Sequence, residues 1–329
     1  MGPRYIGEGS YGCVVYPMIP CSGKNPDPRI AKSNAGKVYA FNDHYEKEST
    51  QYKIIERIDP NEDYFIYSHA NDSCKVEYEV IPRECNNVQY NHKQMGQKEF
   101  KQAWMSYGGT RIDTYVKNQM RRNKPMNPYN FLLSLMPTLF GIELLGRKGY
   151  CHQDIKSGNI LIHSTSLITR IIDYSVMIPL NRVYQVENFK RLKYSYSVYP
   201  PEYKLFMKPP DPYKSVISNI FNRNEARGNL YMKLYPEKTL RAHVDRVAKW
   251  LANPKTILDE SHALLVDVYS TGMMMLDLSR YLEPIDIKGP FYKQFIALIK
   301  WMVHPDPRKR AQPSEVLQEA RNILSRHKK

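Results

Sequence analysis

The feature that most constrains the fold is an apolar run of sixteen residues, ALLVDVYSTGMMMLDL, at positions 263–278. A helix through this run is apolar on nearly every side, and such a helix is stable only inside a core. Two amphipathic stretches, 291–303 and 313–329, have the helical spacing needed to cover part of it. The C-terminal part of the chain is therefore expected to be a large helical lobe.

The first hundred residues have a different pattern. Stretches rich in β-branched and aromatic residues, at 3–17, 35–41 and 63–69, predict strands of an antiparallel sheet. The stretch 43–60 has helical spacing and ends at a proline. Residues 75–100 show no clear period and predict a surface excursion.

These two patterns predict an α+β fold with two lobes. The small antiparallel β-rich lobe with one helix spans 1–105, and the larger, mostly helical lobe spans 110–329. Paired glycines within 106–109 predict a hinge between them. In the larger lobe, residues 131–150 predict a helix with a kink at Pro137.

The charge balance favours anionic partners. Lys and Arg number 48 and Asp and Glu 33, so the net charge is 48 − 33 = +15. Such a charge attracts nucleotides, nucleic acids, acidic proteins or membrane surfaces. The basic clusters are short and lack interleaved aromatic residues, so nucleic acid is not expected as a substrate.

Five cysteines are scattered along the chain without a CxxC pair. Their odd number and irregular spacing indicate neither a zinc site nor a disulfide framework. The first residues lack the apolar core of a signal peptide, and no apolar run approaches the roughly 18 residues of a membrane span. We therefore expect an intracellular, soluble protein in a reducing compartment.

Residues 7–12, GEGSYG, have the glycine spacing of a phosphate-binding loop and are followed by Val14. Glycine-rich hairpins are common, so this motif alone is weak evidence. Its strand–turn–strand context disfavours a dinucleotide-binding site, in which the glycines open a helix. The motif needs partners elsewhere in the chain before it can be interpreted as a phosphate lid.

Such partners occur at 151–162, CHQDIKSGNILI, where His152, Asp154, Lys156 and Asn159 follow the order H-x-D-x-K-x-x-N. Each of these residues alone could be an ordinary cap or turn residue. Their order and their place after a long predicted helix make the set more specific.

A second aspartate, Asp173, ends the apolar stretch RIID. A buried aspartate needs a partner, and a divalent cation is one candidate. Asn159 and Asp173 together offer the hard oxygen ligands that Mg²⁺ prefers.

Three later motifs complete the pattern: YPPE at 199–202, DVYSTG at 267–272 and HPDPRKR at 304–310. With six motifs in the correct order, the chain resembles the eukaryotic-type protein kinases over nearly its whole length. The resemblance implies a single bilobal kinase domain that binds ATP with Mg²⁺ or Mn²⁺. It also implies a serine/threonine kinase that transfers the γ-phosphate of ATP to protein hydroxyl groups.

The resemblance also implies an ATP-binding site, in which the glycine loop covers the phosphates while Val14 and Leu161 enclose the adenine. The implied ATP-binding residues are Ile6, Gly7, Glu8, Gly9, Ser10, Tyr11, Gly12, Val14, Ala35, Lys37, Met105, Ser106, Tyr107, Gly108 and Leu161.

Lys37 is the candidate for the lysine that binds the α- and β-phosphates, because Ala35 precedes it by two positions as in the family. Lys32 is the alternative, since extra sequence in this region blurs the register. The glutamate that would hold the lysine is Glu48, with Glu46 as the alternative.

The remaining roles follow from the same resemblance. Asp154 would orient the attacking hydroxyl and accept its proton, and Lys156 would neutralise charge on the transferring phosphoryl group. Asp267 would brace the catalytic loop, and Glu202 would pair with Arg310 as a structural contact. Asn159 and Asp173 would be the metal ligands.

The sequence also departs from the family. Gln153 replaces an arginine that usually meets a phosphate on the activation segment, and Ser175 replaces a glycine after Asp173-Tyr174. We interpret both changes as altered regulation. Residues 203–266 form an unusually long connection with a helical insertion at about 209–262. One or two extra helices are predicted in its stretch 222–254.

A compact, divergent kinase of this kind resembles those encoded by large nucleocytoplasmic DNA viruses, which would place it in the host cytoplasm or the virion. The alternative function is a pseudokinase that binds nucleotide or a partner without turnover, which Gln153 and Ser175 motivate. A small-molecule kinase of related fold is a third hypothesis, disfavoured by the YPPE motif. The protein substrate, and phosphorylation at Tyr194, Ser195 or Ser197, stay open.

Overall fold

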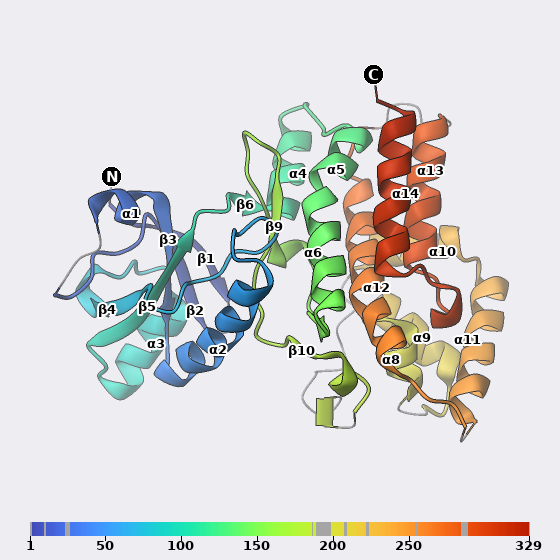
Figure 1. Cartoon of the computed structure of the whole chain (residues 1–329), viewed down its shortest axis with the longest axis horizontal. Helices are drawn as coiled ribbons and strands as arrows, with labels where there is room; N and C mark the ends of the chain where they lie inside the picture. The colour runs from blue at the N-terminus through green and yellow to red at the C-terminus, as the bar shows by residue number, and fades with distance from the viewer. Residues whose placement is uncertain are drawn as a thin grey trace. The chain divides into compact units, whose positions relative to one another are not determined.

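The computed structural model divides the chain into two compact units, Met1–Gly109 and Thr110–Lys329. The first contains a small antiparallel sheet and the second is mostly helical, which confirms the predicted α+β class (Figure 1). The boundary lies at the end of the predicted hinge, residues 106–109. The structure describes residues 2–9, 11–23, 27–185, 187–188, 199–206, 209–221, 224–253, 255–283 and 289–328.

The N-terminal unit is built on a five-stranded sheet with strand order β1-β2-β3-β5-β4 and antiparallel neighbours. The strands are β1 (Arg4–Gly9), β2 (Gly12–Tyr16), β3 (Asn34–Tyr39), β4 (Ser73–Glu77) and β5 (Glu99–Ser106). Side chains from four of these strands, among them Val15, Val38, Val76 and Phe100, form one buried cluster.

Helical segments flank this sheet: α1 (Pro28–Ser33), α2 (Asn42–Ile58), the 3₁₀ turn η1 (Tyr78–Val80) and α3 (Asn86–Met95). Helix α2 is the one predicted at 43–60. It buries Glu48, Tyr52 and Ile55, which lie on one face because they are four and three positions apart. Helix α2 packs against β3 and β5, whereas α3 packs against β2.

Two predictions for this unit are wrong. Residues 63–69 form an isolated bridge at Phe65 rather than a strand of the five-stranded sheet, and the Asp59 carboxylate accepts three backbone N–H groups at the start of this segment. Asp63, Tyr64 and Phe65 donate to it at 3.1, 2.8 and 3.0 Å. The predicted excursion 75–100 is instead ordered into most of β4, η1, α3 and the start of β5.

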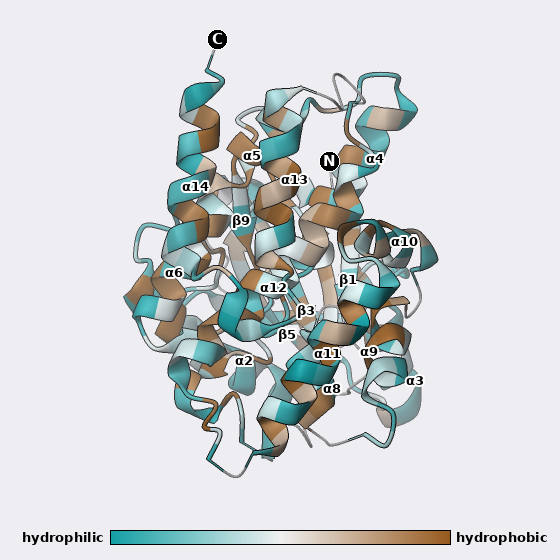
Figure 2. Cartoon of the chain, turned by 90° about the vertical axis from the view of Figure 1, so that its right-hand side faces the viewer, coloured by the Kyte–Doolittle hydropathy of each residue, from teal (hydrophilic) through white to brown (hydrophobic). Residues whose placement is uncertain are grey.

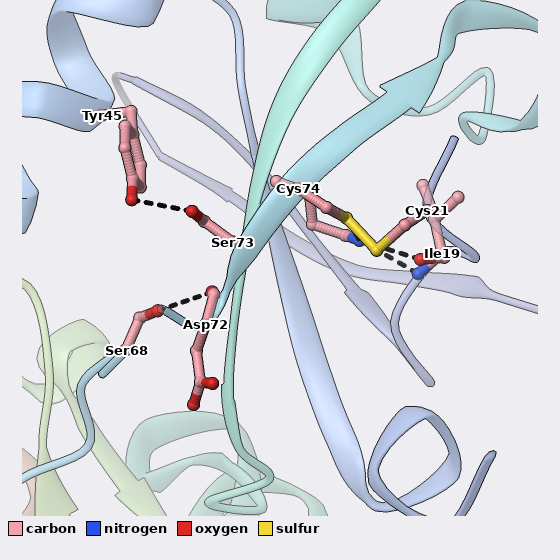
Figure 3. Close-up of a disulfide and its surroundings, with 8 residues drawn as sticks. Ile19, Cys21, Tyr45, Ser68, Asp72, Ser73 and Cys74 are labelled. Atoms are coloured by element: carbon pink, nitrogen blue, oxygen red, sulfur yellow. Dashed lines mark hydrogen bonds between the residues drawn. A yellow bond between two sulfur atoms is a disulfide. The ribbon is translucent and has the colours of Figure 1, made fainter. Parts of the chain in front are cut away.

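The expectation of no disulfide framework is also wrong. Cys13 is bonded to Cys85 and Cys21 to Cys74, while Cys151 is free and buried. Figure 3 shows Cys74 on β4 joined to Cys21, close to Ile19. The backbone N–H and carbonyl of Ile19 are both hydrogen-bonded to the buried Gln102 side chain, at 3.0 and 2.8 Å. Pairing across 72 and 53 residues depends on sheet topology, which cysteine spacing alone does not reveal.

The C-terminal unit is built around α12 (Glu260–Ser279), the helix predicted from the apolar run, and most of the residues of α12 are buried. Among the described residues of this unit, the other helices are α4 (Ile112–Arg121), α5 (Pro128–Ser134), α6 (Met136–Arg147), α8 (Pro201–Phe206), α9 (Pro212–Phe221), α10 (Glu225–Leu234), α11 (Glu237–Ala252), α13 (Pro290–Met302) and α14 (Pro313–Arg326). Both teal and brown residues run along α11 and α14 in Figure 2, as expected of amphipathic helices.

The structure divides one predicted helical region more finely than expected and agrees with the prediction for another. The stretch 131–150 forms α5 and α6, which separate at Leu135 rather than bending at Pro137. The described part of the stretch 222–254 contains α10 and α11, which confirms the prediction of one or two helices there, and α9 precedes them. Asn224 caps the start of α10 by accepting the Arg227 N–H at 3.0 Å, which separates it from α9.

Short strands and 3₁₀ turns hold the loops of this unit. Strands β6 (Thr110–Arg111), β8 (Ile160–Ile162) and β9 (Thr169–Ile171) form one sheet, and β7 (Tyr150–Cys151) pairs with β10 (Ile178–Pro179). The turns are η2 (Ser157–Asn159), η3 (Leu180–Arg182) and η4 (Pro307–Lys309).

Among the described residues, one helical stretch, Pro128–Arg147, is long and apolar enough to cross a membrane by length and composition. It is 56% buried inside the fold and is divided between α5 and α6. Core helices pass the same test, so this stretch is weak evidence for a membrane span.

We predict that Gly12→Ala destabilises the protein by roughly 2–3 kcal/mol. A Cβ at this position would lie 1.9 Å from the Val38 carbonyl oxygen. Neither backbone can move away easily, because Gly12 and Val38 lie on the paired strands β2 and β3. Urea denaturation measures the loss. The matched control is Gly9→Ala, because a Cβ there would meet nothing within 4 Å. Equal midpoints for the two variants would contradict this account.

Candidate functional site

The glycine-rich hairpin joins β1 and β2, with Gly9 opposite Gly12 and Gly7 opposite Val14. The three glycines differ in their surroundings. Gly12 has no room for a side chain, whereas a Cβ at Gly7 or Gly9 would meet no atom within 4 Å. Packing in this structure therefore accounts for glycine at 12 but not at 7 and 9. Glycine at those two positions leaves the backbone open to close approach by a ligand.

Lys37 on β3 forms an ion pair with Glu48 on α2. The Lys37 Nζ lies 2.6 and 2.5 Å from the two carboxylate oxygens of Glu48, and the side chains are 14% and 3% exposed. The Tyr52 hydroxyl donates to Glu48 Oε1 at 2.7 Å, and the Tyr39 hydroxyl is 3.1 Å from that of Tyr52. This buried network fixes the lysine at one position in front of the sheet.

The alternative residues do not share this geometry. Lys32 lies exposed in the short helix α1, and Glu46 lies exposed on α2. The pairing of Lys37 with Glu48 therefore has a structural basis that the pairing of the alternatives lacks. Tyr52, four positions after Glu48 on the buried face of α2, is a further member of this hydrogen-bond network.

The residues proposed for the adenine side of the N-terminal unit lie on neighbouring strands. Ala35 on β3 is directly opposite Met105 on β5, and the Tyr107 ring stacks on Tyr16 with centroids 4.1 Å apart. Gly108 follows in the same loop, and Ser106 closes β5 with a hydrogen bond to Glu62.

The other predicted nucleotide residues are distributed as follows. Ile6 and Glu8 lie on β1, and Tyr11 lies in the turn before β2. Leu161 lies on β8 of the C-terminal unit. Ser10 lies outside the described residues, as do Tyr194, Ser195 and Ser197.

In the C-terminal unit, Asp154 is the centre of a polar cluster. Lys156 Nζ donates to Asp154 Oδ2 at 2.6 Å, and the Asn159 amide donates to the same oxygen at 2.8 Å and to the Asp154 carbonyl at 2.9 Å. The Asp154 N–H donates to His152 Nδ1 at 3.2 Å. Lys156 and Asn159 thus converge on the Asp154 carboxylate, while His152 accepts the Asp154 backbone N–H.

Burial raises the pKa of Asp154 above its ordinary value, although Lys156 and His152 act in the opposite direction. The negative charge of Asp173 raises this pKa further, which indicates that the two carboxylates are electrostatically coupled. Hydrogen bonds also connect their segments, since the Ile172 N–H donates to the Asn159 carbonyl at 3.0 Å.

The backbone of this cluster is held in an unusual conformation. Gln153 and Asp173 have φ values of 63° and 67°, a region that residues other than glycine seldom adopt. Such conformations persist only when surrounding contacts impose them, and they concentrate at functional sites.

Asp267 on α12 supplies one of those contacts. Its carboxylate accepts the backbone N–H groups of His152 at 2.6 Å and of Gln153 at 2.9 Å. Burial raises the pKa of Asp267, and burial followed by the Asp267 charge raises the pKa of the neighbouring Cys151 thiol. Asp267 is thus hydrogen-bonded to the backbone of the loop that the resemblance implied it would hold.

Glu202 and Arg310 form a second, fully buried ion pair. Arg310 donates from Nη1 to Glu202 Oε1 at 2.6 Å and from Nη2 to Oε2 at 2.9 Å, and neither side chain is exposed. The remaining guanidinium donors reach the His304 and Leu265 carbonyls. Removing one partner of such a pair costs about 3–5 kcal/mol, because it leaves a buried charge without its partner.

The sequence did not reveal the contacts of Gln153, which is fully buried. Its amide nitrogen donates to the Val176 carbonyl at 2.9 Å. Its amide oxygen accepts from Asn188 at 2.8 Å and from the Tyr203 hydroxyl at 3.1 Å. No spacing rule points to Asn188, so only the folded backbone identifies this neutral network.

Neither family models nor curated proteins match this chain. The described ranges also contain no group of three or more His, Cys, Asp or Glu side chains arranged to hold a metal ion. A function for this chain must therefore be inferred from the geometry of the two clusters around Lys37 and Asp154.

We predict that acid destabilises the C-terminal unit through His304. Burial and the neighbouring His243 lower the pKa of His304 to about 4, and Arg310 acts in the same direction while Asp306 opposes it. The folded state then binds fewer protons than the unfolded state between about pH 6.5 and 4. Stability from this residue is complete above pH 6.5 and is lost as the pH falls through 4.

Thermal melts of wild type, His304→Asn and His163→Asn between pH 7 and 4 test this prediction. Asparagine at 304 keeps an acceptor for the Asp306 N–H but does not titrate, so the acid-induced fall in Tm should shrink by about 3–6 °C. His163 is exposed, so His163→Asn should retain the wild-type pH profile. An unchanged profile in His304→Asn would exclude His304 as the source.

Proposed function

We propose that this protein is an ATP-dependent serine/threonine protein kinase. The observation that carries the proposal is the convergence of Lys156 and Asn159 on the buried Asp154 carboxylate. Asp267 holds the loop that carries Asp154 by accepting the His152 backbone N–H. This arrangement provides a carboxylate that can accept a proton beside a cation that can neutralise a phosphoryl group.

The N-terminal unit supports the same proposal independently. The ion pair with Glu48 holds the Lys37 ammonium group at a fixed position on β3. Strand β3 pairs with β2, the second strand of the glycine-rich hairpin. In the proposed reaction Lys37 binds the α- and β-phosphates of ATP. Gly7 and Gly9 let backbone N–H groups approach the phosphates without obstruction.

The residues present fit a magnesium ion bound together with the nucleotide. The Asn159 amide nitrogen is committed to Asp154, which leaves its Oδ1 oxygen as a ligand. The Asp173 carboxylate supplies a second hard oxygen, and two such ligands with phosphates and water suit Mg²⁺ better than a complete protein cage. When bound, the ion would neutralise charge on the phosphates.

The roles of the chain's own residues follow from these positions. Asp154 orients the substrate hydroxyl and takes its proton as the bond to phosphorus forms. Lys156, 2.6 Å from Asp154, stabilises the negative charge on the transferred group and limits the rise in the pKa of Asp154. Asp267 keeps the backbone between His152 and Gln153 in the conformation that presents Asp154.

A pseudokinase is the second candidate, favoured by the fully buried Gln153 where the related enzymes carry arginine. The network from Gln153 to Asn188 and Tyr203 is neutral, so it would not attract a phosphate group. This feature concerns regulation rather than chemistry, because the proposed base and metal ligands are all retained.

The test is a phosphorylation assay with labelled ATP, Mg²⁺ and a generic basic or acidic protein, together with nucleotide-binding measurements. We expect Asp154→Asn to lower kcat by at least about 100-fold while nucleotide binding persists, since a general base contributes that much. Lys37→Met should reduce activity by more than about tenfold, and the exposed Lys32→Met should not.

Equal labelling by wild type and Asp154→Asn would exclude the kinase activity. If nucleotide still bound under those conditions, the pseudokinase would be the better description. If Lys32→Met lost activity and Lys37→Met retained it, the assignment of the phosphate-binding lysine would be wrong.

A further inference from the structure

We propose that α3 is a positioning element that holds the glycine-rich hairpin for nucleotide binding, with Asn87 and the Cys13–Cys85 disulfide as its principal contacts. This inference rests on the proposed function, because the hairpin that α3 holds is the proposed phosphate-binding loop. Helix α3 itself lies outside the predicted site. Helix α3 lies in the region 75–100, in which the sequence alone gave no periodic signal.

The first contact is made through Glu8 on β1. Its Oε1 oxygen accepts the Asn87 backbone N–H at 2.6 Å, and its Oε2 oxygen accepts from the Asn86 side chain at 3.1 Å. Asn87 is the second residue of α3, whose first N–H groups have no partner within the helix. Glu8 therefore caps α3 from another element, and its negative charge also suits the positive end of the helix dipole.

The second contact reaches the hairpin backbone. The Asn87 side chain donates to the Gly9 carbonyl at 2.9 Å, at the end of β1. One residue thus binds β1 twice, through its N–H to Glu8 and its amide to Gly9. These two hydrogen bonds fix the end of β1, directly before the turn of the hairpin.

The third contact fixes the opposite strand. Cys13 on β2 is bonded to Cys85, the residue directly before α3, and both are fully buried. Because Cys13 pairs with Glu8 across the hairpin, the disulfide and the carboxylate cap hold the same level of the two strands.

A fourth contact links α3 to the turn itself. The Asn91 side chain donates to the Ala40 carbonyl at 2.7 Å, and the Ala40 N–H donates to the Tyr11 carbonyl at 3.0 Å. Asn91 is 1% exposed, and neighbouring Val88 belongs to the apolar cluster under the sheet. Helix α3 is therefore anchored in the core while it holds both strands and the turn of the hairpin.

Such anchoring has a specific kinetic consequence. A hairpin held in its phosphate-binding conformation lowers the ordering cost of binding ATP. Its contacts to the phosphates persist from the bound substrate to the transition state, so weakening them should raise KM and leave kcat nearly unchanged. A role in general stability alone would not separate the two constants in this way.

The experiment compares ATP kinetics of wild type, Asn87→Ala and Gln94→Ala. Asn87→Ala should raise KM for ATP about three- to tenfold, the loss expected for one or two hydrogen bonds, with kcat changed by less than about twofold. Gln94 lies exposed on the same helix, so Gln94→Ala should behave as wild type.

The two disulfides provide a matched second comparison, because they close loops of similar length, 72 and 53 residues. The double variant Cys13→Ser/Cys85→Ser should raise KM for ATP, and Cys21→Ser/Cys74→Ser should lower Tm comparably without changing KM. Equal effects of both pairs on KM, or no effect of Asn87→Ala, would overturn the proposal.

Amide hydrogen exchange separates failure of this inference from failure of the proposed function. If wild type neither binds nor uses ATP, the kinase proposal fails, and exchange at residues 7–12 still tests whether α3 anchors the hairpin. Faster exchange there in Asn87→Ala than in Gln94→Ala would support anchoring by α3. Identical exchange in the two variants would overturn it.

Discussion

The C-terminal unit depends on the carboxylate of Asp267, which is buried in the central helix α12. An ionised carboxylate in such a place is unfavourable unless hydrogen bonds compensate for lost water. The compensation comes from the backbone of His152 and Gln153, so the core helix and the functional loop stabilise each other. The left-handed conformation of Gln153 is maintained at the same point.

Glu202 and Arg310 are likewise buried charges whose loss of water is compensated by hydrogen bonds. All donors of the guanidinium described above have oxygen partners, including the carbonyl of Leu265 on the central helix. Such a pair adds little stability over an apolar substitute, but it tolerates few alternative arrangements. It therefore fixes α8 and the segment around η4 to the same helix that braces Asp154.

Local patterns predicted the parts of the structure whose causes are local. The buried helix at 263–278, the helix carrying Glu48 and the strand carrying Lys37 follow from periodicity and residue type. The convergence of Lys156 and Asn159 on Asp154 follows from close spacing along the chain. The sequence and the resemblance therefore indicated which residues lie near one another within each unit, but not the hydrogen bonds that these residues form.

The failures have non-local causes. The Asp59 carboxylate accepts the backbone N–H groups of residues 64 and 65. Hydrophobic periodicity does not show that a side chain competes with a sheet for such donors. The cap that Glu8 provides for α3 joins residues almost eighty positions apart. The partners of Gln153 and the pairing of the cysteines likewise depend on which segments the topology brings together.

The buried Cys151 has a consequence for oxidative folding. Five cysteines can form two disulfides in fifteen ways, since there are five choices of the unpaired residue and three pairings of the other four. Once the C-terminal unit has folded, Cys151 is inaccessible and its raised pKa suppresses the reactive thiolate. Only three arrangements then remain, so folding of one unit narrows the search for correct cross-links in the other.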